Sequence, residues 1–149
     1  MSRVRCRIVL LLTVTCLFIS GVSLAGDAAG YLRQGIDFAN QGLYDEAINA
    51  LQQALELDET DVSTLSALGT VYMYQGKSPD AIKTLQKAIE ADPEAAVPHY
   101  VLAMIYETQS VYQKSVKHWK NFIELSTDEA LKKEAKKHIE RLTELQNEK

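Results

Sequence analysis

The sequence of 149 residues predicts an all-α solenoid of three helical hairpins and a final capping helix. From residue 28 onward, a pattern of small and aromatic residues recurs every 34 positions, three times over. Each period contains two apolar helical patterns separated by a short turn, and a further amphipathic helical pattern follows the third period. A single hairpin cannot bury its own apolar face, so the hairpins are expected to stack on one another.

The first 25 residues follow a different pattern. Arg3, Arg5 and Arg7 precede an apolar run over 8–19, and small residues follow as far as Ala25. This order is typical of a secretory signal peptide (1–25) that is cleaved after Ala25. The run is shorter than the ~20 residues of a membrane-spanning helix. An uncleaved anchor and a helix buried in the fold are the alternatives.

Removal of this segment changes the composition of the chain. Cys6 and Cys16 leave with it, so no thiol remains for a disulfide, a metal site or a nucleophile. A chain without thiols suits an oxidising compartment. We therefore expect export to the bacterial periplasm, or a membrane-anchored chain facing it. The remaining 13 basic and 20 acidic residues give a net charge of −7, which does not fit a nucleic-acid partner.

Small residues occupy one mid-helix column of the period, at Gly35, Gly69 and Ala103. Glycine at such a position costs about 1 kcal/mol of helix stability relative to alanine. That cost is tolerable where the second helix of the hairpin crosses too closely for a side chain. We expect Ala47 and Ala81 to face this column from the second helix.

Turn residues punctuate each period. Gly42 and Gly76 follow the first helices, where the left-handed conformation is favoured. Ser78 is expected to cap the next helix, with Pro79 in its first turn. Pro98 is compatible with a helix only near its start.

The residues of these columns resemble the tetratricopeptide repeat. The resemblance covers 28–61, 62–95 and 96–129, and the third copy departs from it with Ser115 and Phe122 where the family prefers alanine. It implies a right-handed superhelical solenoid that binds other proteins and has neither catalytic activity nor a cofactor.

A last helix is expected over 127–147, opened by a capping box between Ser126 and Glu129. Its predicted buried stripe covers the end of the stack and consists of Leu131, Ala135, Ile139, Leu142 and Leu145. From residue 113 onward there are nine basic and seven acidic residues, against four and 13 between 27 and 112. We interpret the basic residues as a solvated face; the alternative is a flank that docks to an acidic partner or to anionic lipid.

No pattern of enzyme chemistry occurs in the chain. His99, His118 and His138 lack the i, i+4 spacing of a helical metal site and are expected to be surface or joint residues. Trp119 falls on an apolar stripe and is expected in the core. Phosphate-binding glycine loops and nucleophile elbows are absent from the sequence. We therefore predict no enzyme activity, no metal and no cofactor.

The resemblance also implies where a partner binds, because the first helix of each hairpin lines the concave side in this family. The matching positions are Ala29, Leu32, Ile36, Ala39, Asn40, Ser63, Ser66, Thr70, Met73, Tyr74, Val97, Tyr100, Met104, Glu107 and Thr108. Among them, we predict a partner-binding groove formed by Leu32, Ile36, Met73, Tyr74, Tyr100 and Met104. Such an apolar groove suits an amphipathic helix or a hydrophobic extended segment.

One branch of the family grips a C-terminal carboxylate with basic and amide side chains. At the matching positions this chain has Leu32, Ile36, Ala67, Val97 and Val101. A receptor for such tails is therefore not expected, and we interpret the protein as an exported adapter. The alternatives are a self-associating structural protein and a membrane-anchored accessory subunit of an envelope assembly. In a further alternative, the groove is covered by packing between repeats or by the start of the chain.

Overall fold

The computed structural model describes residues 24–147, and the elements in that range are all helices. They are α2 (Leu24–Asn40), α3 (Tyr44–Leu57), α4 (Val62–Tyr74), α5 (Ser78–Ala91), α6 (Ala96–Thr108), α7 (Tyr112–Leu125) and α8 (Glu129–Asn147). The expected signal peptide lies almost wholly outside the described residues. Within 24–147, no helix combines the length and hydropathy needed to cross a bilayer.

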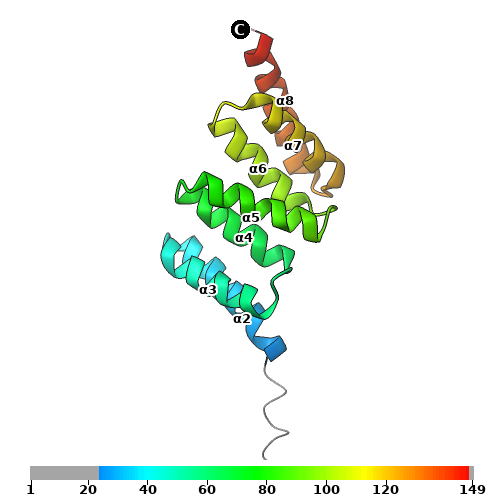
Figure 1. Ribbon diagram of the computed structural model, residues 1–149. Coiled ribbons are helices and arrows are strands. Elements are labelled where there is room, and N and C mark those ends of the chain that lie inside the picture. The colour runs from blue at the N-terminus through cyan, green and yellow to red at the C-terminus, as the bar shows by residue number, and fades with distance from the viewer. Residues whose placement is uncertain (1–23, 148–149) are drawn as a thin grey trace, which may run out of the picture.

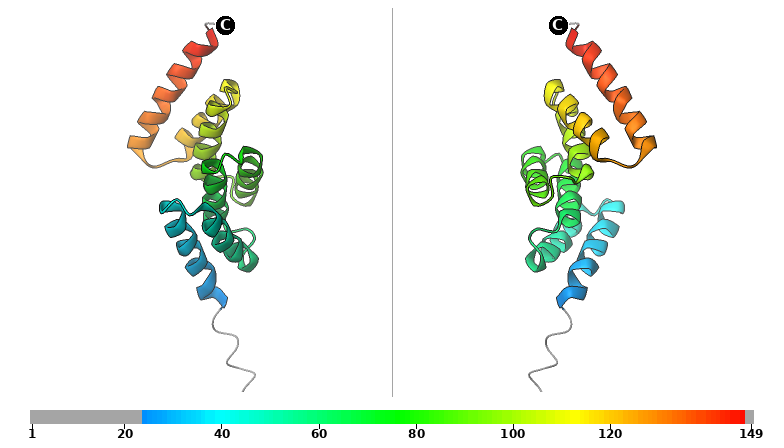
Figure 2. Two further views of the ribbon diagram at one scale, coloured as in Figure 1. Left: turned by 90° about the vertical axis from the view of Figure 1, so that its left-hand side faces the viewer. Right: turned by 90° about the vertical axis from the view of Figure 1, so that its right-hand side faces the viewer.

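The helices form three antiparallel hairpins, α2–α3, α4–α5 and α6–α7, stacked along one axis with α8 packed on α7 (Figure 1). The first helices of the hairpins, α2, α4 and α6, also contact one another in turn. Seen from the side, α2 and α8 lie on one side of the axis and α5 on the other (Figure 2). The prediction of an all-α solenoid of three hairpins and a capping helix is confirmed.

The turn inside each hairpin uses a left-handed residue. Gly42 has φ 76° and Gly76 has φ 73°, as the sequence predicts, and the third hairpin has Ser110 at φ 59°. Backbone hydrogen bonds close each turn, for example from Lys77 N to Tyr72 O at 2.9 Å. These bonds satisfy carbonyls that a helix end would leave unpaired.

Replacing Ser110 with glycine should raise the free energy of unfolding by about 1 kcal/mol. The left-handed conformation is unfavourable for a residue with a Cβ by about 1–2 kcal/mol, and the entropy of glycine in the unfolded chain offsets part of the gain. Urea unfolding of wild type and variant measures the difference. Gly76→Ser is the reciprocal control and should destabilise by a similar amount; if neither change alters stability, the turn conformation is wrong.

Two of the predicted helix caps are wrong. Ser78 is the first residue of α5, and the cap position is Lys77, whose side chain makes no capping bond. At α8 the cap is Asp128, whose Oδ1 accepts hydrogen bonds from the backbone nitrogens of Ala130 and Leu131 at 2.9 and 3.0 Å. Ser126 instead accepts a bond from Asp128 N at 3.1 Å, so the helix begins later than the spacing of a capping box predicted.

The glycine column does mark a close approach between the helices of a hairpin. A Cβ added to Gly69 would lie 2.6 Å from Leu85 Cγ, and one added to Gly35 would lie 2.6 Å from Leu51 Cγ. The closest neighbour of each glycine is thus a leucine. The expected alanine also lies at Gly35, where Ala47 O would be 3.3 Å from the added Cβ, whereas the three atoms nearest to a Cβ at Gly69 all belong to Leu85. Ala81, like Ala47, is nevertheless fully buried.

The capping helix is attached by apolar and polar contacts. Ala135 and Leu142 are buried against the cluster of Trp119 and Phe122, as their stripe predicted. Leu131 and Leu145, at the two ends of that stripe, are each 37 % exposed. The expectation that Trp119 belongs to the core is confirmed.

Glu107 of α6 joins the third hairpin to the capping helix. Its carboxylate accepts hydrogen bonds from Trp119 Nε1 at 3.3 Å and from Arg141, and lies 3.0 Å from His138 Nδ1. The Glu107 side chain is only 17 % exposed. Glu107, which was predicted on the concave face, therefore binds side chains of α7 and α8.

Candidate functional site: an uncharged cleft between the first helices

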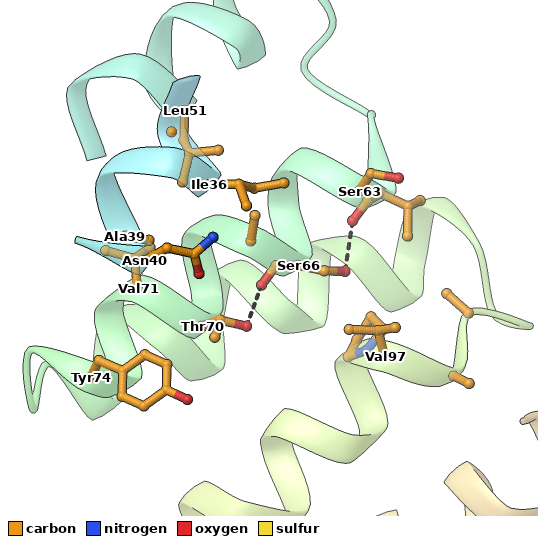
Figure 3. A pocket seen from close by; sticks show the side chains of 16 residues that line it. Ile36, Ala39, Asn40, Leu51, Ser63, Ser66, Thr70, Val71, Tyr74 and Val97 are labelled. Atoms are coloured by element: carbon orange, nitrogen blue, oxygen red, sulfur yellow. Dashed lines mark hydrogen bonds between the residues drawn. The ribbon is translucent and has the colours of Figure 1, made fainter. Parts of the chain in front are cut away.

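An interhelical cleft of about 550 Å³ opens between α2, α4 and the start of α6 (Figure 3). Its lining residues are Gly35, Ile36, Ala39, Asn40, Leu51, Val62, Ser63, Ser66, Ala67, Thr70, Val71, Tyr74, Ala95, Ala96, Val97 and Pro98. None of them carries a charge. A pocket that is mostly apolar, with a few polar groups, is the usual form of a binding site.

Helical periodicity explains why α4 forms the floor. Ser63, Ser66 or Ala67, Thr70 and Tyr74 follow one another at three- and four-residue steps, so they share one face of the helix. Short side chains on this face leave room between α2 and α6. The cleft therefore depends on the small residues of α4 as much as on the apolar residues at its edges.

The hydroxyl groups of the floor bond to their own helix. Ser66 Oγ donates to Val62 O at 2.6 Å, and Thr70 Oγ1 donates to Ser66 O at 2.8 Å. These donors are therefore not free for a ligand. Because they face their own backbone, the floor presents mainly carbon to the cleft.

Three large apolar side chains stand exposed at the edge of the cleft. Tyr74 is 62 % exposed, Val97 56 % and Ile36 43 %. The Tyr74 ring stacks on Tyr44 of the preceding hairpin, with 6.1 Å between ring centroids and 9° between planes. Clustered apolar groups that remain in water commonly mark a contact surface.

The structure brings only two of the six predicted groove residues, Ile36 and Tyr74, to this cleft. The other four pack against core clusters: Leu32 in the first hairpin, Met73 and Tyr100 between the second and third, and Met104 beside Trp119.

Tyr100 also makes edge contacts with Trp119 and Phe122 at 5.1 and 5.2 Å between centroids. Burial, together with the nearby Glu134 and Tyr74, raises the pKa of its phenol above the ordinary value.

Sequence reasoning placed Ala39, Asn40, Ser63, Ser66, Thr70 and Val97 on the concave face without assigning them to the groove. Of the segment 95–98 at the start of α6, sequence reasoning placed only Val97 on the concave face, although Ala95, Ala96 and Pro98 also line the cleft. Its Val97 is one of the most exposed large apolar residues of the described chain. The sequence feature that could have identified this part of the cleft is Val97 itself, an apolar residue in the first turn of the first helix of a hairpin.

Two of the three histidines, His99 and His118, meet within the third hairpin. Of the two positions expected for His99, surface or joint, the surface position is wrong, because the residue is 6 % exposed and lies in the first turn of α6. His99 Nδ1 lies 2.9 Å from His118 Nδ1, and the His118 ring stacks on Tyr106. Burial, and then the charges of His99, Lys117 and Lys114, lower the pKa of His118 to about 4.

Burial and the charge of Lys117 also lower the pKa of His99. Within 24–147, no three potential ligand side chains converge as a metal site would require.

Comparisons with known proteins agree with this architecture. A family model described as tetratricopeptide repeat matches residues 39–105, whereas no curated protein matches the sequence. One similar solved structure is the first TPR domain of Spaghetti (RPAP3) bound to the HSP90 peptide SRMEEVD. It is 15% identical, has a TM-score of 0.74, and the match covers 82% of this chain and 94% of that one.

Two further structures have the same arrangement of helices. The Arabidopsis OM64 TPR domain matches with a TM-score of 0.75 at 15% identity, over 82% of this chain and 98% of that chain. The TPR2B domain of yeast Sti1, in a complex with pHsp70, matches with a TM-score of 0.73 at 15% identity, over 80% and 98%. The repeat period, the three stacked hairpins and these matches lead to one conclusion: the chain contains tetratricopeptide repeats, matched by the family model over residues 39–105, and has the fold of tetratricopeptide repeat domains. Members of this family are in general protein-interaction modules.

Proposed function

We propose that the protein is an adapter that binds a segment of another protein in the interhelical cleft. The observation that carries this proposal is the uncharged, mostly apolar cleft with Ile36, Tyr74 and Val97 exposed at its edge. These side chains can bury apolar area only when another surface covers them. Each fully buried side chain of this size contributes roughly 1.5–3 kcal/mol.

The similar domains support a peptide as the partner, and the lining of this cleft indicates a different peptide chemistry. The Spaghetti domain is bound to an HSP90 peptide that contains two glutamates and an aspartate. A site for such a peptide needs cations to balance the desolvated carboxylates. The cleft described here contains no lysine, arginine or histidine. An apolar segment therefore fits this chain better than an acidic tail.

We also propose that the adapter acts outside the cytoplasm, in the bacterial periplasm or anchored to the membrane facing it. The support comes from the basic and apolar order of the first 25 residues and from cysteines confined to them. Fractionation should recover a chain that begins at Gly26 in the periplasm. Full-length protein with Met1 intact in the cytosol would overturn this part of the proposal.

The double change Tyr74→Ala and Val97→Ala should weaken binding of a cleft-directed peptide at least about thirtyfold. Truncation of aromatic and apolar anchors at the centre of an interface commonly loses ~2 kcal/mol or more. The probe is a hydrophobic peptide selected from a displayed peptide library against the folded chain, and its Kd is measured by fluorescence anisotropy.

Two controls interpret this result. Leu145→Ala removes an exposed apolar side chain from α8, outside the cleft, and should leave the Kd unchanged. Lys133→Glu with Lys137→Glu reverses charge on the basic flank and should change only the salt dependence. If the lysine changes release the peptide and the cleft changes do not, the flank is the binding site and the proposal is wrong.

A further inference from the structure

Both loops that join the hairpins end at the interhelical cleft. Residues 58–61 lead into α4 and residues 92–95 lead into α6, and the first turns of both helices line the cleft. The two loops lie at the same edge of the stack (Figure 1). In Figure 3, Ser63 and Val97 lie toward one end of the cleft and Tyr74 toward the other.

These loops carry five carboxylates and no basic residue: Asp58, Glu59, Asp61, Asp92 and Glu94. Lysine and arginine are absent from 57–76 and from 88–113. The N-termini of α4 and α6 contribute a partial positive charge of about +0.5 each, much less than the five formal negative charges. Within 24–147, none of the five carboxylates forms an ion pair.

Local hydrogen bonds hold three of these carboxylates in place: Asp61 at the start of α4, and Asp58 and Asp92 at the ends of α3 and α5. Asp61 Oδ2 accepts from Thr64 N at 2.8 Å, and Asp92 Oδ1 accepts from Glu94 N at 2.9 Å. Asp58 Oδ1 accepts from Thr60 N at 3.0 Å in the same way. These hydrogen bonds fix the positions of the three aspartate carboxylates. Glu59 and Glu94, in the same two loops, are exposed to solvent.

We infer that the partner segment carries lysine or arginine beside its apolar anchors. This inference rests on the proposed function and names the chemistry of the partner. Its apolar side chains occupy the cleft between Ile36, Tyr74 and Val97, and its basic side chains reach the carboxylates of the 58–61 and 92–95 loops. Complementary charge at one end also sets the direction in which the segment lies. An acidic tail would be repelled at the same end.

Three peptides test this inference. They share a central segment of leucine, isoleucine, phenylalanine and leucine, and carry two lysines, two glutamines or two glutamates on one side of it. We expect the lysine peptide to bind about tenfold or more tightly than the glutamate peptide, with the glutamine peptide between them. The difference should shrink when salt rises from about 0.05 M to about 0.5 M, since the loops are exposed.

A matched pair of protein variants locates the effect. Glu59→Gln with Glu94→Gln removes two exposed charges whose side chains make no hydrogen bond within the described chain. It should weaken binding of the lysine peptide about threefold and leave the glutamine peptide unchanged. Glu46→Gln with Glu140→Gln removes two exposed charges from α3 and α8, outside the two loops, and should alter neither Kd.

Each outcome decides a different point. If all three peptides bind with one Kd and Tyr74→Ala with Val97→Ala weakens them equally, the cleft binds apolar segments and the charge inference is wrong. If none of the three binds to the folded chain, the proposed function fails together with the inference. If light scattering of the chain alone shows a dimer that Glu59→Gln with Glu94→Gln dissociates, the occupant is the basic α8 of a second copy, and the inference of a foreign partner is overturned.

Discussion

Replacing Gly69 with leucine should lower the free energy of unfolding by about 3 kcal/mol, the upper end of the range for overpacked cores. The first added atom would already lie 2.6 Å from Leu85 Cγ and 2.7 Å from its Cδ2. Leu85 is fully buried, and protein interiors leave few voids into which such a side chain could shift. The α4 and α5 helices must therefore separate, which also disturbs their contacts with the hairpins on either side.

Urea unfolding followed by circular dichroism measures this effect. Because each hairpin is stabilised mainly by its neighbours, the variant should also lose cooperativity and show a broader transition. Gly30→Leu is the matched control, since a Cβ at Gly30 meets nothing within 4 Å. That change should be neutral or slightly stabilising, because leucine favours a helix more than glycine does. An unchanged midpoint for Gly69→Leu would show that the two helices do not cross closely there.

Acidification should destabilise the third hairpin by about 2 kcal/mol through His118. The folded-state pKa of His118 is about 4, below the 6.5 of an unperturbed histidine. Between these values the unfolded chain binds a proton that the folded chain does not, so stability falls as the pH falls from 6.5 to 4. Since the ring is only partly buried, solvent screening keeps the penalty below the full value of this shift.

The physical cause lies in how the two imidazoles are paired. His99 Nδ1 and His118 Nδ1 are 2.9 Å apart, so one ring must donate and the other must accept, and both cannot be protonated. Lys114 and Lys117 on α7 add positive charge near the pair, and the Tyr106 ring covers His118.

Nuclear magnetic resonance titration of the His118 ring gives its pKa directly, and urea unfolding across this pH window gives the stability. His118→Gln should remove the part of the pH dependence that lies between 6.5 and 4. Carboxylates titrate equally in both proteins, so the difference between the two curves isolates the histidine. A His118 pKa near 6.5 would contradict the buried pair.

The sequence was most informative where the controlling interactions are local. The left-handed turns at Gly42 and Gly76 follow from residue type and position, because few other residues adopt that conformation readily. Ser110 keeps the same conformation although it is not a glycine, because the surrounding hydrogen bonds hold the third turn in register. The helix caps were less predictable from the sequence, because Ser126 and Asp128 are both suitable N-cap residues for α8. In the structure Asp128, and not Ser126, accepts the hydrogen bonds from the first turn.

The residues that line the cleft were harder to predict from the sequence than the helices were. Tyr100 and Met104 have the expected positions on a first helix, but their side chains pack against the third hairpin and the capping helix. Residues on one face of a first helix can point either into the open cleft or against the side chains of an adjacent helix. The choice depends on the angle between successive hairpins, which no single repeat encodes. Likewise, no local spacing could show that His99 and His118, 19 residues apart, would meet in the interior.

By itself, the sequence determined the helices, the hairpin turns and the order in which the hairpins stack. A 34-residue period of apolar and small residues leaves one way for each hairpin to bury its apolar face. Only the tertiary structure decided where the interhelical cleft lies, that Val97 stands exposed at its edge, and that two acidic loops lie at the same edge of the stack. These features arise from distances between side chains in different repeats, and those distances depend on how the stacked helices pack.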